Sequence, residues 1–237
     1  VYFGFVYWAE TGTLAGVVTG LALIAALFVC VVLHEYGHAL TARRYGIGTR
    51  NITLLPIGGV ALLEKMPKDP RQEIVVALMG PAVNIAIAAV LFLFLSITGR
   101  PGALFELSAA PQSFLVSILY ANIFLAVFNL IPAFPMDGGR VLRAVLALRT
   151  DRVQATRMAA NIGQTLAIGF GILGLFFNPF LILIAVFIWI GAAGEASAVE
   201  IESNLYRQPV GRAMITDFQT LAPDDPLARA IDLTLGG

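Results

Sequence analysis

The residues most able to do chemistry are two histidines four positions apart, with a glutamate directly after the first. They are His34, Glu35 and His38, and the whole chain contains 2 histidines, so both lie in this pattern. Residues at i and i+4 share one face of a helix. Both imidazoles can therefore bind one metal ion while the neighbouring carboxylate acts as a general base. We interpret the pattern as a metal site rather than a structural polar patch.

A catalytic zinc ion usually has three protein ligands and keeps a fourth position open. Because the chain has no further histidine, the third ligand must be a carboxylate or a thiolate. Asp137 is the favoured candidate. Pro132 and Pro135 precede it and cannot continue a regular helix, and Gly138 and Gly139 follow it and permit a sharp backbone turn. A helix end with turn residues explains the prolines and glycines but not the aspartate.

The single cysteine, Cys30, excludes an intramolecular disulfide framework and a cysteine-rich metal site. It precedes His34 by four residues and so shares its helix face, which keeps a thiolate ligand open as an alternative. A small buried apolar residue is the more usual role of a free cysteine.

The composition excludes an ordinary soluble domain. Hydrophobic residues make up 58% of the chain and charged residues 13%, whereas soluble domains have about 25% charged residues. The 15 Lys and Arg balance 15 Asp and Glu, which excludes nucleic-acid binding based on net charge. The composition therefore predicts a membrane protein.

Apolar stretches predict the elements that carry these residues. A bilayer core of about 30 Å needs about 20 helical residues, and five stretches approach or exceed that length: residues 14–33, 74–98, 113–131, 158–177 and 180–199. Residues 1–8 are interpreted as the tail of a further span whose beginning is missing, and not as a signal peptide. We expect an all-α polytopic membrane protein with about six transmembrane helices, the first of them truncated.

The distribution of positive charge predicts the orientation. All Lys and Arg residues except Arg100 fall in segments 43–71 and 140–157 or in the C-terminal tail. Because cytoplasmic connections carry the excess of positive charge, the first full span is expected to run inward, with a cytoplasmic C-terminus in a multi-pass cell-membrane protein. His34 then lies about 30 Å along its helix from residue 14, near the inner face, and Asp137 reaches that face after the span that begins near residue 113.

The combined motifs resemble the site-2 protease family of intramembrane zinc metalloproteases. The matching segments are 34–38, 58–61, 80–84 and 129–139. The resemblance implies cleavage of the transmembrane segment of a membrane-protein substrate. It further implies that His34, His38 and Asp137 bind one Zn²⁺ per chain, and that Glu35 activates the zinc-bound water.

Further residues are candidates for substrate or oxyanion binding. Asn84 and Asn129 are polar residues in or next to apolar spans, and either could stabilise an oxyanion or form hydrogen bonds between helices. Residues 51–64, with Gly58 and Gly59, predict a short re-entrant β-hairpin-like loop whose free edge could hold an unwound substrate. The alternative is an ordinary cytoplasmic loop.

The tail differs in character from the rest of the chain. We predict a transmembrane metalloprotease domain over residues 1–206 and a truncated cytoplasmic CBS-like domain over residues 207–237. The resemblance of the tail to CBS modules implies adenine nucleotide as a partner of the complete region. A non-catalytic, CBS-regulated metal-binding transporter or channel is the alternative function, although a transporter does not need a glutamate beside paired histidines.

Overall fold

The computed structural model describes residues 13–55, 58–63, 67, 69–98 and 114–207, and positions 211, 214, 220, 221, 225–229 and 231. The chain divides into two compact units, Val1–Val199 and Glu200–Gly237. The predicted span tail at residues 1–8 lies outside the described residues, as does most of the CBS-like segment.

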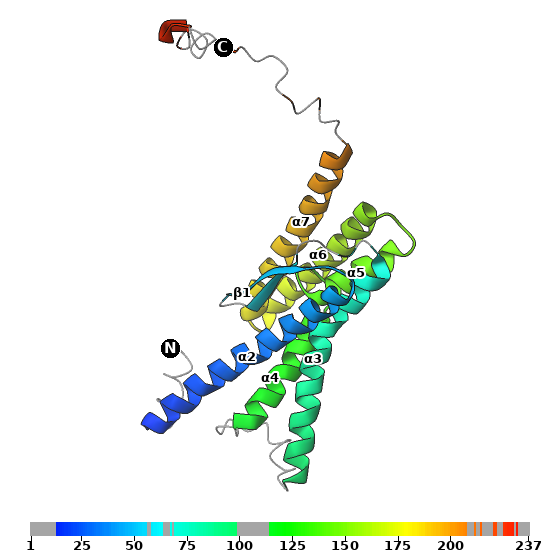
Figure 1. Ribbon diagram of the computed structural model, residues 1–237. Coiled ribbons are helices and arrows are strands. Elements are labelled where there is room, and N and C mark those ends of the chain that lie inside the picture. The colour runs from blue at the N-terminus through cyan, green and yellow to red at the C-terminus, as the bar shows by residue number, and fades with distance from the viewer. Residues whose placement is uncertain are drawn as a thin grey trace. The chain divides into compact units, whose positions relative to one another are not determined.

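Helices make up most of the described chain (Figure 1). They are α2 (Leu14–Arg44), α3 (Pro70–Ile97), α4 (Phe114–Asn129), α5 (Asp137–Ala147), α6 (Arg152–Phe176) and α7 (Phe180–Arg207). Several begin where a side chain accepts hydrogen bonds from the first free amides. The caps are Thr13 for α2, Asp69 for α3 and Asp151 for α6.

Four of the described helices are long and apolar enough to cross a bilayer: α2, α3, α6 and the Phe180–Asn204 part of α7. Each corresponds to a predicted apolar stretch. The remaining stretch, residues 113–131, gives the shorter apolar helix α4. The helix is shorter than the predicted stretch because it ends at Asn129, ahead of Pro132, and its 16 residues span about 24 Å. The protein is therefore a mostly helical membrane protein.

Helix α3 is the centre of the site-bearing part of the fold and packs against α2, α4 and α5. Figure 1 shows α2 crossing α3, with α4 beside them. The crossing is close at Gly37 of α2, where a Cβ atom would lie 2.6 Å from the carbonyl oxygen of Met79. The absence of a side chain at Gly37 therefore allows the two helices to approach.

The second half of the turn between α4 and α5 is largely buried. Ala133 and Phe134 are fully inaccessible to solvent and belong to two apolar clusters with residues of α6 and α7, including Ala159, Ile188 and Ala192. Irregular backbone at membrane depth is tolerated where protein surrounds it. The α6 and α7 helices thus enclose the segment that leads to Asp137.

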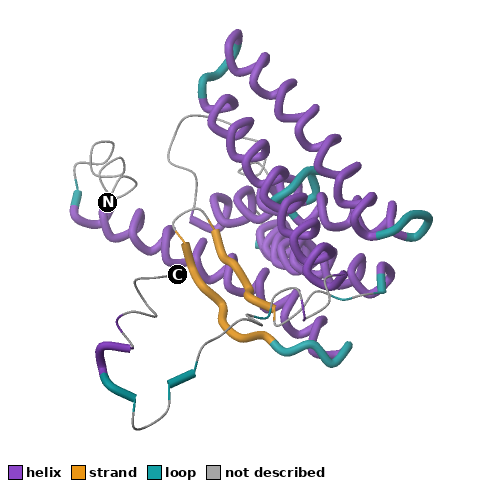
Figure 2. The backbone as a smooth tube through the Cα atoms, turned by 90° about the horizontal axis from the view of Figure 1, so that it is seen from above, coloured by secondary structure: helices purple, strands orange, loops and turns teal. Residues whose placement is uncertain are grey.

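Two strands, β1 (Thr49–Leu55) and β2 (Gly58–Leu63), form an antiparallel pair in which Leu55 opposes Gly58. Both strands contact α2, and Figure 2 shows them in orange. They occupy the segment for which a hairpin-like loop was predicted. Their position relative to the bilayer stays a prediction.

The segment 140–157, which was expected to connect two spans on the cytoplasmic side, is largely helical. Residues 137–147 form helix α5, and α6 begins at Arg152, six residues before the predicted start of its apolar stretch. Because of their charged residues, α5 and the first turns of α6 lie outside the uncharged apolar stretches. At least one of these charges, on Arg143, is buried and paired rather than exposed in a loop.

Candidate metal centre

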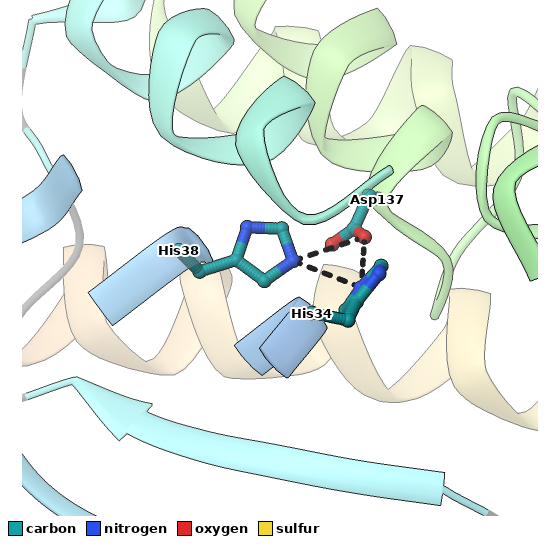
Figure 3. A group of neighbouring side chains, drawn as sticks. All are labelled: His34, His38 and Asp137. Carbon is teal, nitrogen blue, oxygen red and sulfur yellow. Dashed lines mark hydrogen bonds and ion pairs between the residues drawn. The ribbon is translucent and has the colours of Figure 1, made fainter. Parts of the chain in front are cut away.

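Three side chains from two distant segments converge at one point (Figure 3). His34 and His38 lie one turn apart on α2, and Asp137 is the first residue of α5. The Nε2 atoms of the two histidines are 3.1 Å apart, and Oδ2 of Asp137 lies 3.1 Å from each of them. All three residues are buried.

The outer ring nitrogen of His38 has a backbone partner. Its Nδ1 lies 2.8 Å from the carbonyl oxygen of Val76 on α3. A carbonyl oxygen can only accept a hydrogen bond, so Nδ1 carries the proton and donates. In the neutral ring the lone pair is then on Nε2, the atom that faces Asp137 and His34.

The outer ring nitrogen of His34 has a side-chain partner. Its Nδ1 lies 2.7 Å from Oδ1 of Asn84 on α3. The amide nitrogen of Asn84 is directed elsewhere and donates to Oδ1 of Asn122 at 3.1 Å. Nδ1 of His34 therefore donates to Asn84, and its Nε2 also presents a lone pair to the centre.

This donor set fits a divalent cation. Two imidazole lone pairs and a carboxylate oxygen are three acceptors facing one another, which is unfavourable without a cation between them. Ligands at about 2.0–2.1 Å from tetrahedral zinc lie about 3.3 Å apart, close to the three separations of 3.1 Å observed here. His34, His38 and Asp137 thus form a possible metal site.

The backbone of α3 borders this site at Gly80. A Cβ atom there would lie 2.2 Å from Nε2 of His38 and 2.6 Å from Nε2 of His34. Such distances are far below van der Waals contact, so a side chain at this position would occupy the space of the ligand atoms. The glycine leaves that space to the three converging atoms.

Two further glycines position Asp137, for a reason other than the one predicted. Gly138 and Gly139 lie in the first turn of α5. Among the described residues, the glycine with a positive φ is Gly46, so the backbone at Gly138 and Gly139 is not left-handed. A Cβ atom at Gly138 would lie 2.3 Å from the carbonyl oxygen of Ile131, and one at Gly139 would lie 2.5 Å from the amide nitrogen of Phe134. The preceding turn folds back onto the start of α5, and the two glycines allow it.

Glu35 is buried on α2, next to His34 in the sequence. Asn84 is fully buried and bonded to His34 and Asn122, which favours the interhelical role over the oxyanion role. Asn129 is the last residue of α4 and is partly buried. Gly58 and Gly59 begin β2.

Cys30 is buried on α2, and its Sγ accepts a hydrogen bond from Nδ2 of Asn122 at 3.3 Å. The group of possible metal ligands among the described residues comprises His34, His38 and Asp137 and does not include it. This position favours the structural role predicted for the cysteine.

Sequence reasoning missed a buried ion-pair network beside the site. Arg143 on α5 donates from Nε to Oε1 of Glu73 on α3 at 2.9 Å, and from Nη1 to Oε2 of Glu195 on α7 at 3.2 Å. Its guanidinium carbon also lies 5.3 Å from the ring centroid of Phe134. Glu195 was the available signal in the sequence, because a charged residue that follows an apolar stretch within a membrane helix indicates a partner of opposite charge.

Comparison with known proteins adds independent evidence. Peptidase family M50 matches residues 22–108 and 97–173. A zinc metalloprotease of Methanocaldococcus jannaschii is 37% identical over 90% of this chain and 60% of its own length. A putative zinc metalloprotease of Synechocystis is 39% identical over 67% of this chain and 41% of its own length. The chain thus spans about half of the length of these two relatives.

The fold of the chain is similar to that of a solved structure. The site-2 protease from Methanocaldococcus jannaschii superposes with a TM-score of 0.61 at 33% sequence identity, covering 92% of this chain and 88% of the other. The matched family regions contain the segments that carry His34, His38 and Asp137. The chain belongs to peptidase family M50, the site-2 protease family.

Proposed function

We propose that the protein is an intramembrane zinc endopeptidase that hydrolyses a peptide bond in or near the transmembrane segment of a membrane-protein substrate. One observation carries the proposal. Three acceptor atoms of His34, His38 and Asp137 converge at 3.1 Å separations among apolar helices, and a buried glutamate directly follows the first of these residues. The zinc metalloprotease relatives support the identity of the metal.

The roles of the side chains follow from their chemistry. A bound zinc ion would supply Lewis acidity to a water molecule and to the scissile carbonyl. Glu35 takes the proton of the attacking water and later delivers it to the leaving amine. His34, His38 and Asp137 would hold the ion, and the bonds from His34 to Asn84 and from His38 to Val76 keep both rings oriented.

Asn129 and the β1–β2 pair are the proposed substrate contacts. Asn129 ends α4, eight residues before Asp137, and its amide could donate to the developing oxyanion. A substrate helix must unwind to expose its peptide bonds. Strand addition to the edge of β1 or β2, near Gly58 and Gly59, would supply backbone hydrogen bonds to the unwound segment.

The orientation of the protein in the membrane and the nature of its C-terminal tail are also proposed. The charge distribution supports an active site toward the cytoplasmic side. Residues 207–237 are proposed to belong to a cytoplasmic CBS-like domain, and adenine nucleotide is proposed as a partner of the complete CBS region.

The function is tested by comparing membranes that contain the active chain with membranes that contain the Glu35→Gln variant. Quantitative proteomics should reveal a membrane protein that accumulates intact only with the variant. If purified protein holds zinc but no membrane protein differs between the two, a non-catalytic transporter or channel becomes the better explanation. A zinc-dependent ion flux that Glu35→Gln leaves unchanged would support that alternative directly.

A further inference from the structure

The polar interactions of His34 continue beyond Asn84 into α4. Asn122 lies in the middle of α4, a mostly apolar helix, and is fully buried. Its Nδ2 donates to the carbonyl oxygen of Ile118 at 2.9 Å, and its Oδ1 accepts from Nδ2 of Asn84 at 3.1 Å. A buried asparagine in an apolar helix is costly unless its hydrogen bonds are satisfied.

The direction of every bond in this series is fixed at one end. The carbonyl of Ile118 can only accept, so Asn122 must direct its NH₂ group toward it. The oxygen of Asn122 then faces Asn84, which must answer with its own NH₂ group. The oxygen of Asn84 is left facing His34, and Nδ1 of His34 must donate.

We propose that Asn122 is a positioning residue for the metal centre. It acts through Asn84 to hold His34 in the tautomer that carries its proton on Nδ1. Only this tautomer leaves the lone pair of Nε2 for a metal ion. Without Asn122, the amide of Asn84 can turn over and present its NH₂ group to Nδ1. That arrangement favours a proton on Nε2 and removes His34 as a ligand. The proposal rests on the metal site of the proposed function.

His38 provides an internal reference. Its Nδ1 donates to the backbone carbonyl of Val76, which cannot turn over. Loss of Asn122 should therefore disturb the tautomer of His34 and leave that of His38 unchanged. Because the chain has 2 histidines, a sample labelled with ¹⁵N in histidine alone gives the imidazole signals of these two rings only.

The experiment compares the wild-type chain, Asn122→Leu and Thr156→Val in detergent by imidazole ¹⁵N NMR, all at the same zinc concentration, so that a cation can occupy the space between the three acceptor atoms. Thr156 is a matched control because it is buried on α6 and bonds to the carbonyl of Arg152 within its own helix. We expect Nδ1–H for both rings in the wild type and in the control. In Asn122→Leu we expect mixed tautomers for His34 and Nδ1–H for His38. A purely Nδ1–H His34 in Asn122→Leu would overturn the proposal.

Zinc affinity, measured by chelator competition, gives the second readout. Outer contacts of metal ligands typically change affinity by about 10–100-fold, so Asn122→Leu should weaken binding by roughly tenfold. Because Asn122 acts through Asn84, the substitution should have no further effect in an Asn84→Leu background. Multiplicative effects of the two substitutions would also overturn the proposal. A wild-type chain that binds no zinc would instead contradict the proposed function.

Discussion

The guanidinium of Arg143 and the carboxylate of Glu73 form a buried ion pair, with a distance of 2.9 Å between Nε and Oε1. The pair joins α5 to α3, and both helices also contribute to the metal centre: Asp137 begins α5, and Asn84 lies on α3. Glu195 of α7 is a second acceptor for the same guanidinium. The network thus connects the helix that begins with Asp137 to two neighbours.

Removal of the positive charge should destabilise the fold strongly. Arg143→Leu would leave Glu73 buried without its partner, and breaking a buried pair in this way costs about 3–5 kcal/mol. Denaturant unfolding of the detergent-solubilised chain should show a loss of this size. Zinc affinity should also fall, because the start of α5 is then less firmly held.

The double variant Arg143→Leu with Glu73→Leu is the control for that prediction. Replacement of both partners of a buried pair by apolar residues is often neutral. It should recover most of the lost stability, although Glu195 keeps an unmatched charge that is partly accessible to solvent. Equal stability of the single and double variants would show that the Arg143–Glu73 pair does not carry the effect.

Glu35→Gln should separate metal binding from catalysis. The amide keeps the size of the side chain but cannot accept the proton of a water molecule at neutral pH. Proteolytic activity should fall by at least about 100-fold, while the zinc content stays at the wild-type level. Zinc analysis and a cleavage assay on the same preparation measure both quantities, and activity near the wild-type level would assign the base to another residue.

Asp137→Asn should lower zinc affinity, because a neutral amide replaces a charged ligand 3.1 Å from both histidine nitrogens. Cys30→Ser serves as the matched control. Its Sγ accepts from Asn122 and lies outside the group of possible ligands, so its zinc content should not change. The opposite pattern, with zinc retained in Asp137→Asn and lost in Cys30→Ser, would make the thiolate the third ligand.

Each half of the centre has a local signal in the sequence. Histidines at i and i+4 must share a helix face, and the proline-rich turn before Asp137 marks the end of a helix. The apolar stretches likewise predicted the four long helices, because length and hydropathy alone decide whether a helix can span a bilayer.

Distant pairs whose members lack such a motif could not be predicted in the same way. Arg143 and Glu73 are 70 positions apart, and Asn122 and Asn84 are 38 apart. The sequence gives no register between the helices that carry them. Helix α5 was missed because its charged residues resembled a loop, whereas packing against α3 and α6 gives them an interior environment. The Val76 carbonyl that orients His38 is a backbone group, which side-chain patterns cannot indicate.

The last prediction concerns the space at the centre itself. Gly80→Ala would place a methyl group 2.2 Å from Nε2 of His38, so either the ring or the α3 backbone must shift. Neither can move freely, since His38 is bonded to Val76 on the same helix as Gly80. Zinc affinity should therefore fall at least about tenfold, as for other changes that misplace ligands, and activity should fall with it.

Gly169→Ala is the matched control for this substitution. Gly169 lies within α6, and a Cβ atom there would have no neighbour within 4 Å. The same methyl group should leave zinc affinity unchanged and raise helix stability slightly, since alanine exceeds glycine in helix propensity by about 1 kcal/mol. Zinc competition and thermal unfolding of both variants separate the two effects. If Gly80→Ala bound zinc as tightly as Gly169→Ala does, the space beside His38 would not be reserved for the metal and its ligands.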